Sequence, residues 1–149
     1  MKYKIDNINE IVDKIRSALL KFPYSTHIKY AILFGSTIHD STHHESDIDV
    51  LVRVDEKSDI INLVVELTFF ISKELCVKED YVDILPIKKK NDVPYDMLYD
   101  IYTNGITIII NDRDTYHRDF VRAISLYCDL QIFLRKHNAV GNFLRILRG

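Results

Sequence analysis

Glycine and proline are scarce in this chain of 149 residues, which has four glycines and three prolines. A dinucleotide-binding fingerprint needs the run G-x-G-x-x-G, and a Walker A loop needs G-x-x-x-x-G-K followed by serine or threonine. The glycines of this chain fit neither spacing. Both kinds of glycine-rich phosphate loop are therefore excluded.

Cysteine and net charge are also low. The two cysteines, Cys76 and Cys128, form no C-x-x-C or metal-ligand spacing and lie in apolar helical patterns, so we expect reduced thiols within the core. Lys and Arg number 20 against 22 Asp and Glu, a formal net charge of −2. This balance gives no overall field that would attract nucleic acid or an anionic membrane.

Long hydrophobic runs are absent as well. The first residues, MKYKIDNINE, contain no apolar signal segment, and no run approaches the ~18 apolar residues that a membrane span needs. We therefore expect a cytoplasmic protein with no membrane partner. The length suits a single domain over 1–149, which would bury about 68–70% of the surface that its unfolded chain exposes.

Hydrophobic periodicity predicts helices and strands in alternation. Asn7 and Ser58 suit the N-caps of two helices, and Gly105 suits the end of a third. The fold class is therefore α/β (α+β), with helices covering a sheet of about four strands. The expected elements are a helix over 8–22, strands over 28–34 and 47–54, a helix over 59–77, a strand over 81–87, a helix over 94–104, a strand over 106–110, and a final helix over about 114–136.

Polar residues gather where the first two expected strands meet. Gly35 and Ser36 follow the first strand, and Asp47 and Asp49 open the second. Strand residues two apart share a face, so both carboxylates can bind hard divalent cations. Asp83 lies between apolar residues of the third strand, which could bring it to the same face. Three converging carboxylates would repel one another unless a cation joins them.

Gly35 also allows a close approach of backbone to phosphate, and the Ser36 hydroxyl can donate to phosphate oxygens. Together these residues indicate metal-assisted phosphoryl or nucleotidyl transfer. Two simpler interpretations remain open. The Asp47 and Asp49 pair could cap a strand end, and Asp83 could be a polar residue on the solvent face of a strand.

The spacing is more informative than its parts. Asp-x-Asp occurs a second time at Asp112 and Asp114, in a polar stretch that we interpret as a solvated loop and helix start. A Gly-Ser pair at one fixed register before Asp-x-Asp is expected by chance at only about 0.0025 per chain. The combination is therefore specific.

Gly35-Ser36, ten intervening residues and Asp47-Ile48-Asp49 resemble the GS-x10-DxD signature of the polymerase-β-like nucleotidyltransferases. Asp83, in YVDILPI, resembles their third carboxylate. The short length, the phrase SDIDVLV and the long last helix resemble the minimal nucleotidyltransferase (MNT) group, antitoxins encoded with HEPN-domain ribonucleases. The resemblance spans about 10–136. It implies a polymerase-β-like fold with a small mixed sheet, a catalytic core over about 10–112, and a C-terminal helix and basic tail over 113–149.

The resemblance also implies roles. Gly35 and Ser36 would bind the nucleotide's phosphates, Asp47 and Asp49 would bind one or two Mg²⁺ ions, and Asp83 would complete the metal site and help activate the acceptor. The implied reaction is transfer of AMP from ATP, the substrate, to a tyrosine hydroxyl of a cognate HEPN toxin within a hetero-oligomer. Where family members often continue GS-x-Ala-Arg-Gly, this chain has Ile38-His39-Asp40.

Two other functions stay open: a non-catalytic antitoxin that neutralises its toxin by binding, and a small-molecule adenylyltransferase subunit. The short length favours a folded protein as acceptor. The loop histidines, with Asp40 and Glu45, lack the other ligands of a zinc site, and we expect them to be exposed; they are His39, His43 and His44.

The end of the chain is both apolar and basic. An apolar stripe on the last helix is expected mainly in the core, with part of it left for a partner: Phe120, Ile124, Tyr127, Leu130 and Leu134. No acid follows Asp129. The basic residues there could contact an acidic partner or RNA, or be merely solvated: Arg135, Lys136, Arg145 and Arg148.

Overall fold

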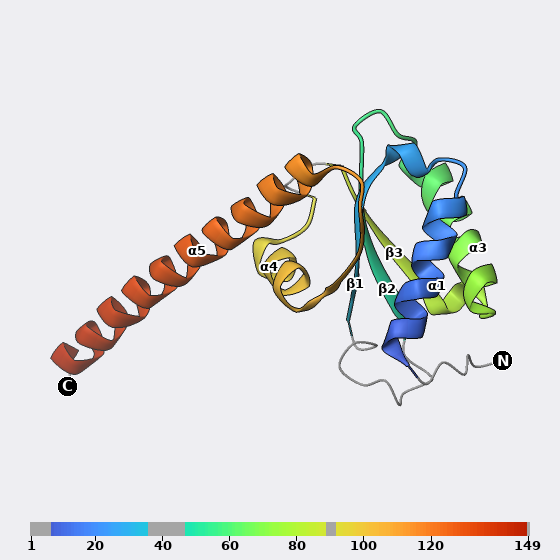
Figure 1. Cartoon of the computed structure of the whole chain (residues 1–149). Helices are drawn as coiled ribbons and strands as arrows, with labels where there is room; N and C mark the ends of the chain where they lie inside the picture. Colours follow the sequence, from blue (N-terminus) through green and yellow to red (C-terminus); the bar gives the residue numbers. More distant parts are fainter. Residues whose placement is uncertain (1–6, 36–46, 89–91, 149) are drawn as a thin grey trace.

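A four-stranded sheet lies between two layers of helices in the computed structural model, which describes residues 7–35, 47–88 and 92–148 (Figure 1). The expected α/β (α+β) class and the small mixed sheet are confirmed. The elements are α1 (Ile8–Lys21), η1 (Ser25–His27), β1 (Ile28–Phe34), β2 (Ile48–Val54), α3 (Ile60–Leu75), η2 (Glu79–Tyr81), β3 (Val82–Ile87), α4 (Tyr95–Asn104), β4 (Ile106–Ile110) and α5 (Arg113–Arg148).

The strand order is β3-β2-β1-β4. β1 pairs antiparallel with both β2 and β4, whereas β2 and β3 are parallel and joined through α3. Pro86 lies in β3 opposite Val52. Proline lacks a backbone N–H, and the edge position of β3 tolerates this loss.

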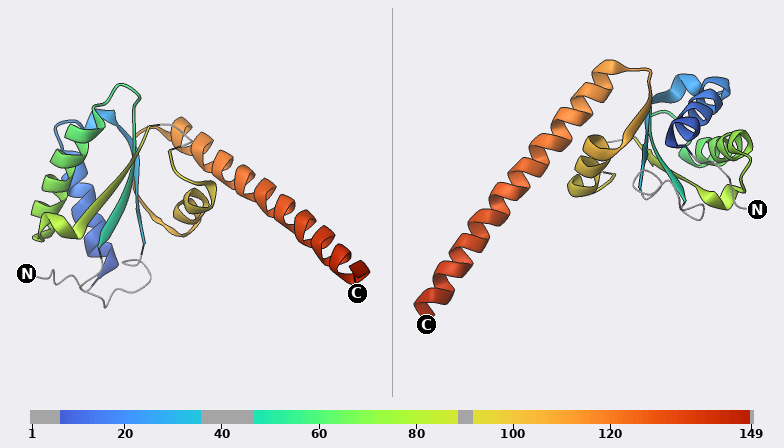
Figure 2. Two further views of the ribbon diagram at one scale, coloured as in Figure 1. Left: turned by 180° about the vertical axis from the view of Figure 1, so that it is seen from behind. Right: turned by 60° about the horizontal axis from the view of Figure 1, so that its bottom comes forward.

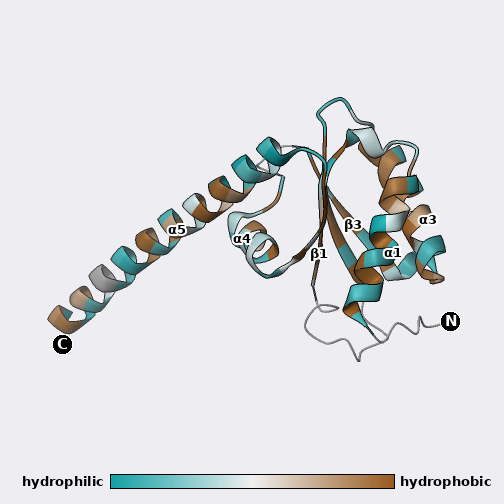
Figure 3. Cartoon of the chain, viewed as in Figure 1, coloured by the Kyte–Doolittle hydropathy of each residue, from teal (hydrophilic) through white to brown (hydrophobic). Residues whose placement is uncertain are grey.

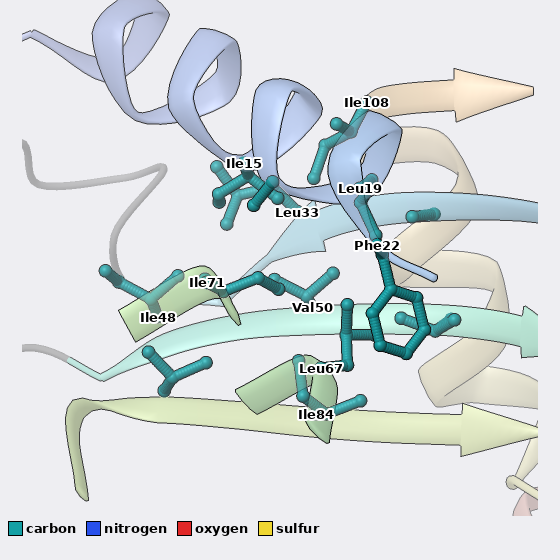
Figure 4. Packing of buried hydrophobic residues seen from close by; sticks show 14 of the residues in the cluster. Ile15, Leu19, Phe22, Leu33, Ile48, Val50, Leu67, Ile71, Ile84 and Ile108 are labelled. Atoms are coloured by element: carbon teal, nitrogen blue, oxygen red, sulfur yellow. The ribbon is translucent and has the colours of Figure 1, made fainter. Parts of the chain in front are cut away.

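Helices α1 and α3 cover one face of the sheet, as Figure 4 shows from close by. Alternate residues of β2 point into this layer, which is the larger of two apolar cores. Burial of this apolar surface is the main force that holds the helices on the sheet. Fully or almost fully buried members include Ile15, Leu19, Leu33, Ile48, Val50, Leu67 and Ile71.

Helix α4 and the first turns of α5 cover the opposite face (Figure 2). Tyr30, Ile32 and Leu51 are buried here with Leu98 and Ile101 of α4. Because side chains alternate along a strand, the remaining odd-numbered residues of β2 also point to this face.

The helix ends show which predicted caps are correct. Asn7 is the N-cap of α1, since its side chain accepts from the Asn9 N–H at 2.9 Å. Asp59 rather than Ser58 caps α3; Ser58 is buried, and its hydroxyl donates to Asp55.

The prediction that both cysteines are core thiols is wrong. Cys76 and Cys128 are free but exposed. Cys76 ends α3 with a left-handed backbone, at φ 56°. It therefore lies just beyond the buried stretch of that helix. Cys128 lies on α5, beyond the residues that pack on the sheet.

Helix α5 begins as expected and extends well past the predicted end at 136. Asp112 precedes it and accepts from the Thr115 N–H at 3.1 Å; the hydrogen bonds from Thr115 lower the pKa of Asp112 to about 2. This confirms that the second Asp-x-Asp pair marks a helix start. The helix continues to Arg148, a length of about 54 Å at 1.5 Å per residue.

Only the first half of α5 packs on the domain. Of the stripe predicted as core, Phe120, Ile124 and Tyr127 are half-buried, and the Tyr127 ring stacks on Tyr99 at 3.8 Å between centroids. The other two, Leu130 and Leu134, are exposed, so they form the part of the stripe that the core leaves uncovered. Among the described residues, no helix has both the length and the apolar character of a membrane span.

Candidate active site

Three neighbouring strands bring the predicted site residues to one end of the sheet. Phe34, the last residue of β1, lies opposite Asp49 of β2, and Asp49 lies beside Asp83 of β3 in the parallel register. Asp47 precedes Asp49 by two residues. Ser36, predicted as a phosphate ligand, and His39, His43 and His44 lie outside the described residues.

Asp49 and Asp83 point to the same face of the sheet. Their neighbours Val50 and Ile84 are buried under α1 and α3, so both carboxylates point to the α4 face. Adjacent strands are only about 4.8 Å apart, so two such side chains are close neighbours. The third strand therefore brings Asp83 to Asp49, as the alternation of apolar residues around it predicts.

The surroundings of Asp49 destabilise the ionised form of its carboxyl group. Burial is the largest cause, followed by the nearby carboxylates of Asp83 and Asp47, and together they raise the pKa of Asp49 to about 6. Each cause disfavours the ionised form. A bound cation would relieve all three. These residues therefore have the electrostatics expected of a cation site.

Gly35 is fitted tightly against Asp49. Its φ of 88° lies in the left-handed region, which residues with a side chain adopt only with strain. A Cβ at this position would also overlap the Oδ2 atom of Asp49. Glycine is thus required by the backbone turn and by the carboxylate that lies against it.

The protein side chains alone do not make a complete metal site. Within residues 7–35, 47–88 and 92–148, no three His, Cys, Asp or Glu side chains gather tightly enough to hold a metal ion. Mg²⁺ seldom uses an all-protein cage; it keeps several waters and takes one or two carboxylates together with substrate phosphates. Oxygen donors from Asp49 and a neighbouring carboxylate fit that mode of binding.

A polar network that the sequence did not reveal lies further along the same face. The Tyr30 hydroxyl donates to Oδ2 of Asp119 at 2.7 Å, and Nε of Arg53 donates to the same oxygen at 3.0 Å. Tyr102 shares a hydrogen bond with Tyr30, and burial raises the pKa of both hydroxyls. Arg53 also donates to the Lys88 carbonyl. The network joins α5 to β1, β2 and the end of β3.

The alternation in β2 places Arg53 on the face of Asp49, so this half of the network could have been predicted. Its partner Asp119 lies far along the chain and carries no local signal. A cavity of about 20 Å³ adjoins both residues. It has room for about one water molecule, so it is no nucleotide site.

A larger hollow, of about 410 Å³, lies at the other end of the sheet from Asp49. Its lining includes Tyr24, His27, Lys57 and Glu66. His27 is paired there with Asp55 at 2.7 Å, and the hydrogen bond from Ser58 is the largest cause that lowers the pKa of Asp55. This hollow contains none of the predicted site residues.

Several solved structures share the fold. A chain from a structure of the toxin-antitoxin MntA-HepT is 20% identical, with a TM-score of 0.56, over 91% of this chain and 97% of that chain. A chain from a toxin-antitoxin structure with AMP-PNP is 22% identical, with a TM-score of 0.60, over 89% and 97%. No curated protein sequence matches the chain.

The sequence also matches a family model. The model described as "Polymerase beta, Nucleotidyltransferase" covers residues 13–114, more than half of the chain. That range includes Gly35, Asp47, Asp49 and Asp83. Family and fold thus agree with the resemblance to polymerase-β-like nucleotidyltransferases. The chain belongs to the polymerase beta nucleotidyltransferase family.

Proposed function

We propose that this chain is an antitoxin that transfers AMP from ATP to a tyrosine hydroxyl of a cognate HEPN ribonuclease toxin. The observation that carries the proposal is the side-by-side placement of Asp49 and Asp83 against the turn at Gly35. Family membership supports nucleotidyl transfer. The similar toxin-antitoxin structures, one of which contains AMP-PNP, support an adenine nucleotide as donor and a toxin as acceptor.

The nucleotide's phosphates would lie against the turn after β1. Gly35 has no side chain there, and the Ser36 hydroxyl would donate to phosphate oxygens. Asp47 and Asp49 would hold Mg²⁺. When bound, Mg²⁺ neutralises charge on the triphosphate and on the leaving pyrophosphate.

Asp83 is exposed, so an acceptor can reach its carboxylate. Its carboxylate accepts the proton of the tyrosine hydroxyl. The phenolic oxygen then forms a bond to the α-phosphorus of ATP, and the bond from that phosphorus to pyrophosphate breaks. The products are a tyrosine adenylate and pyrophosphate, and the proton passes from Asp83 to water.

The test is incubation of the protein with labelled ATP, Mg²⁺ and the product of the adjacent reading frame, followed by intact-mass measurement. We expect the mass of the partner to rise by one or more AMP units. Asp47→Asn and Asp49→Asn should each lower the rate by about 10²–10³-fold, as expected when a group that stabilises the transition state is lost. Asp114→Asn, from the second Asp-x-Asp pair, is the matched control and should keep the rate.

The same experiment separates the other functions. If the double Asn variant still neutralises the toxin and no nucleotide is consumed, the protein acts by binding alone. If AMP appears on a small molecule and not on the partner, the protein is a small-molecule adenylyltransferase. The first result would overturn the transfer activity, and the second would overturn the proposed acceptor.

A further inference from the structure

The last part of α5 leaves the domain and projects away from it. We call residues 128–148 the helical arm; Figures 1 and 3 show it extending beyond α4. It is about 30 Å long at 1.5 Å per residue. Of its side chains that the structure describes, all but Gln131 are exposed. This part of the helix therefore takes no stability from the domain's core.

The exposed surface of the arm is largely apolar. Ile132 is 51% exposed, Phe143 61% and Leu147 66%. At 100° per residue, these three side chains lie within about 60° of one another on the helix. Phe133, Leu144 and Ile146 widen this apolar face, which also carries the charged residues Asp129 and Lys136, whereas the exposed Leu130 and Leu134 lie on the other side of the helix.

This face is distinct from the one that packs on the domain. Asp119 and Ala123, which contact the sheet and α4, point about 130° away from the centre of the arm's apolar face on an ideal helix. The apolar face of the arm is therefore not a continuation of the side of α5 that packs on the domain. Exposed apolar patches of this kind mark sites of interaction.

The arm is also basic. It carries Arg135, Lys136, Arg145 and Arg148, and the sequence has no acid after Asp129. Lys136 falls in the middle of the apolar face, and the three arginines lie at its border or on the other side. A matching surface is an apolar groove with a carboxylate to pair with Lys136 and further acids on its rim.

Three other occupants match less well. Two arms packed in register in a parallel pair would bring Lys136 against Lys136, and these like charges would repel. A bilayer would have to take up the Lys136 charge in the centre of the buried face. RNA would gain little from the aliphatic Ile132 and Leu147, since its recognition uses basic and aromatic side chains.

The root of the arm is fixed to the strand that carries the site. Asp119 binds Arg53 of β2 at 3.0 Å, and Asp49 is on the same strand. Asp49 also points to the face of the sheet from which α5 departs. A protein held by the arm would therefore lie on the side of the sheet that carries the carboxylates.

We propose that the apolar face of the helical arm, with Lys136 at its centre, is the docking surface for the acceptor protein, through an acid-rimmed apolar groove of that protein. The inference rests on the proposed function for the identity of the acceptor. In this proposal the arm provides affinity for the acceptor, and the carboxylates at the end of the sheet carry out AMP transfer. Binding and transfer can therefore be measured separately.

The test compares two full-length double variants that add the same charge. Ile132→Glu with Phe143→Glu alters the apolar face, whereas Asn138→Glu with Asn142→Glu alters the other side of the arm. Calorimetry measures the dissociation constant for the product of the adjacent reading frame. We expect the apolar-face variant to weaken binding by about 100-fold or more, the range of interface hot spots, and the control to stay within about threefold of wild type.

Binding of ATP with Mg²⁺ should be unchanged in both variants, which shows that the domain is folded. Equal affinity of the two variants for the partner, or no binding by the wild-type protein, would overturn the inference. Three further results would overturn it: dimerisation of the wild-type protein in light scattering, binding to vesicles of anionic phospholipid, or binding to RNA. Each counts only if the apolar-face variant loses that property and the control variant keeps it.

The outcomes also separate the two proposals. A partner that binds through the arm but gains no AMP would leave the docking surface in place and reject the transfer activity. AMP transfer that persists at full affinity in the apolar-face variant would retain the activity and reject the docking surface.

Discussion

Asp49 is ionised at neutral pH at a cost in free energy, because burial and the charges of Asp83 and Asp47 raise its pKa to about 6. An acid whose pKa is raised by folding stabilises the fold while it is protonated, and this contribution is lost as the pH rises through the folded pKa. We therefore expect Asp49→Asn to raise the stability of the metal-free protein above pH 6. Asp49 is partly exposed, so the gain should be about 1 kcal/mol, or a few degrees in Tm.

The measurement is thermal unfolding by circular dichroism in chelator, from about pH 3.5 to about pH 7.5. Wild type and Asp49→Asn should coincide below the unfolded pKa of about 3.9 and separate as the pH approaches 6. Asp129→Asn, an exposed position on α5, should show no such separation. A difference that is constant with pH would mean that the amide acts through packing rather than charge.

Gly35 gives a second prediction, since its left-handed backbone and its contact with Asp49 both require the absence of a side chain. Gly35→Ala should destabilise the fold by about 1–3 kcal/mol through strain. It should also displace the Asp49 carboxylate and lower Mg²⁺-dependent transfer by about 10²-fold, the scale of a small misplacement of reacting groups.

Gly141 is the matched control for this substitution. A Cβ there would meet nothing within 4 Å, and the residue is in the middle of a helix. Gly141→Ala should therefore stabilise the protein by about 0.5–1 kcal/mol and leave transfer unchanged. Urea unfolding and the intact-mass assay measure both variants. Equal behaviour of the two alanines would show that the turn at Gly35 tolerates a side chain.

Helix α5 packs on the sheet through apolar contacts, and one carboxylate adds a buried polar link. Asp119, whose side chain is 16% exposed, accepts hydrogen bonds from both Arg53 and Tyr30. Asp119→Ala would leave the Arg53 charge buried without its partner, which should cost about 2–4 kcal/mol. Asp119→Leu combined with Arg53→Met should recover part of that loss, because both buried charges are then removed together.

Urea unfolding of Asp119→Leu, Arg53→Met and their double variant gives the coupling between the two residues. The exposed pair of Asp13 and Arg16, with side chains 72% and 43% exposed, is the control. Asp13→Ala should change stability by less than about 0.5 kcal/mol. A comparably small effect at Asp119 would mean that α5 is held by its apolar contacts alone.

The elements differ in how far their sequences determine them. Every predicted strand and helix before α5 lies within about two residues of its observed bounds, because an apolar face repeats through each one. The prediction for α5 stopped at 136, since beyond Leu134 the apolar residues lie on another face of the helix and Gly141 resembles a break. The cap that ends α3 was also not predicted from the sequence. Cys76 ends this helix in a left-handed conformation, at a position where glycine is the usual signal.

The candidate site was largely predictable because its signals are local. The turn at Gly35 and the pair Asp47 and Asp49 lie in one short stretch of sequence, and Asp83 follows from alternation within its strand. The link between Arg53 and Asp119 was not predictable. It depends on how α5 packs over β2, and no short-range pattern encodes that contact.

In the whole molecule, catalysis and docking are proposed for separate parts that α5 connects. The carboxylates occupy one end of the sheet, and the arm starts from α5, which is fixed to β2 by Arg53 and Asp119. An acceptor held by the arm is thereby given both a high local concentration and an orientation. Only the orientation depends on the angle about the helix axis between the side of α5 that packs on the domain and the apolar face of the arm.

This dependence can be tested by inserting two alanines between Asp129 and Leu130. The insertion turns the arm's apolar face by about 200° and moves it by about 3 Å, without changing the residues on that face. The dissociation constant for the acceptor should therefore stay within about threefold of wild type, whereas AMP transfer should fall by about 10²-fold, because the hydroxyl is no longer aimed at the site. The same two alanines placed after Arg148 should alter neither property. If transfer survives the internal insertion, the arm acts as a tether, and the orientation must come from contacts between the acceptor and the domain.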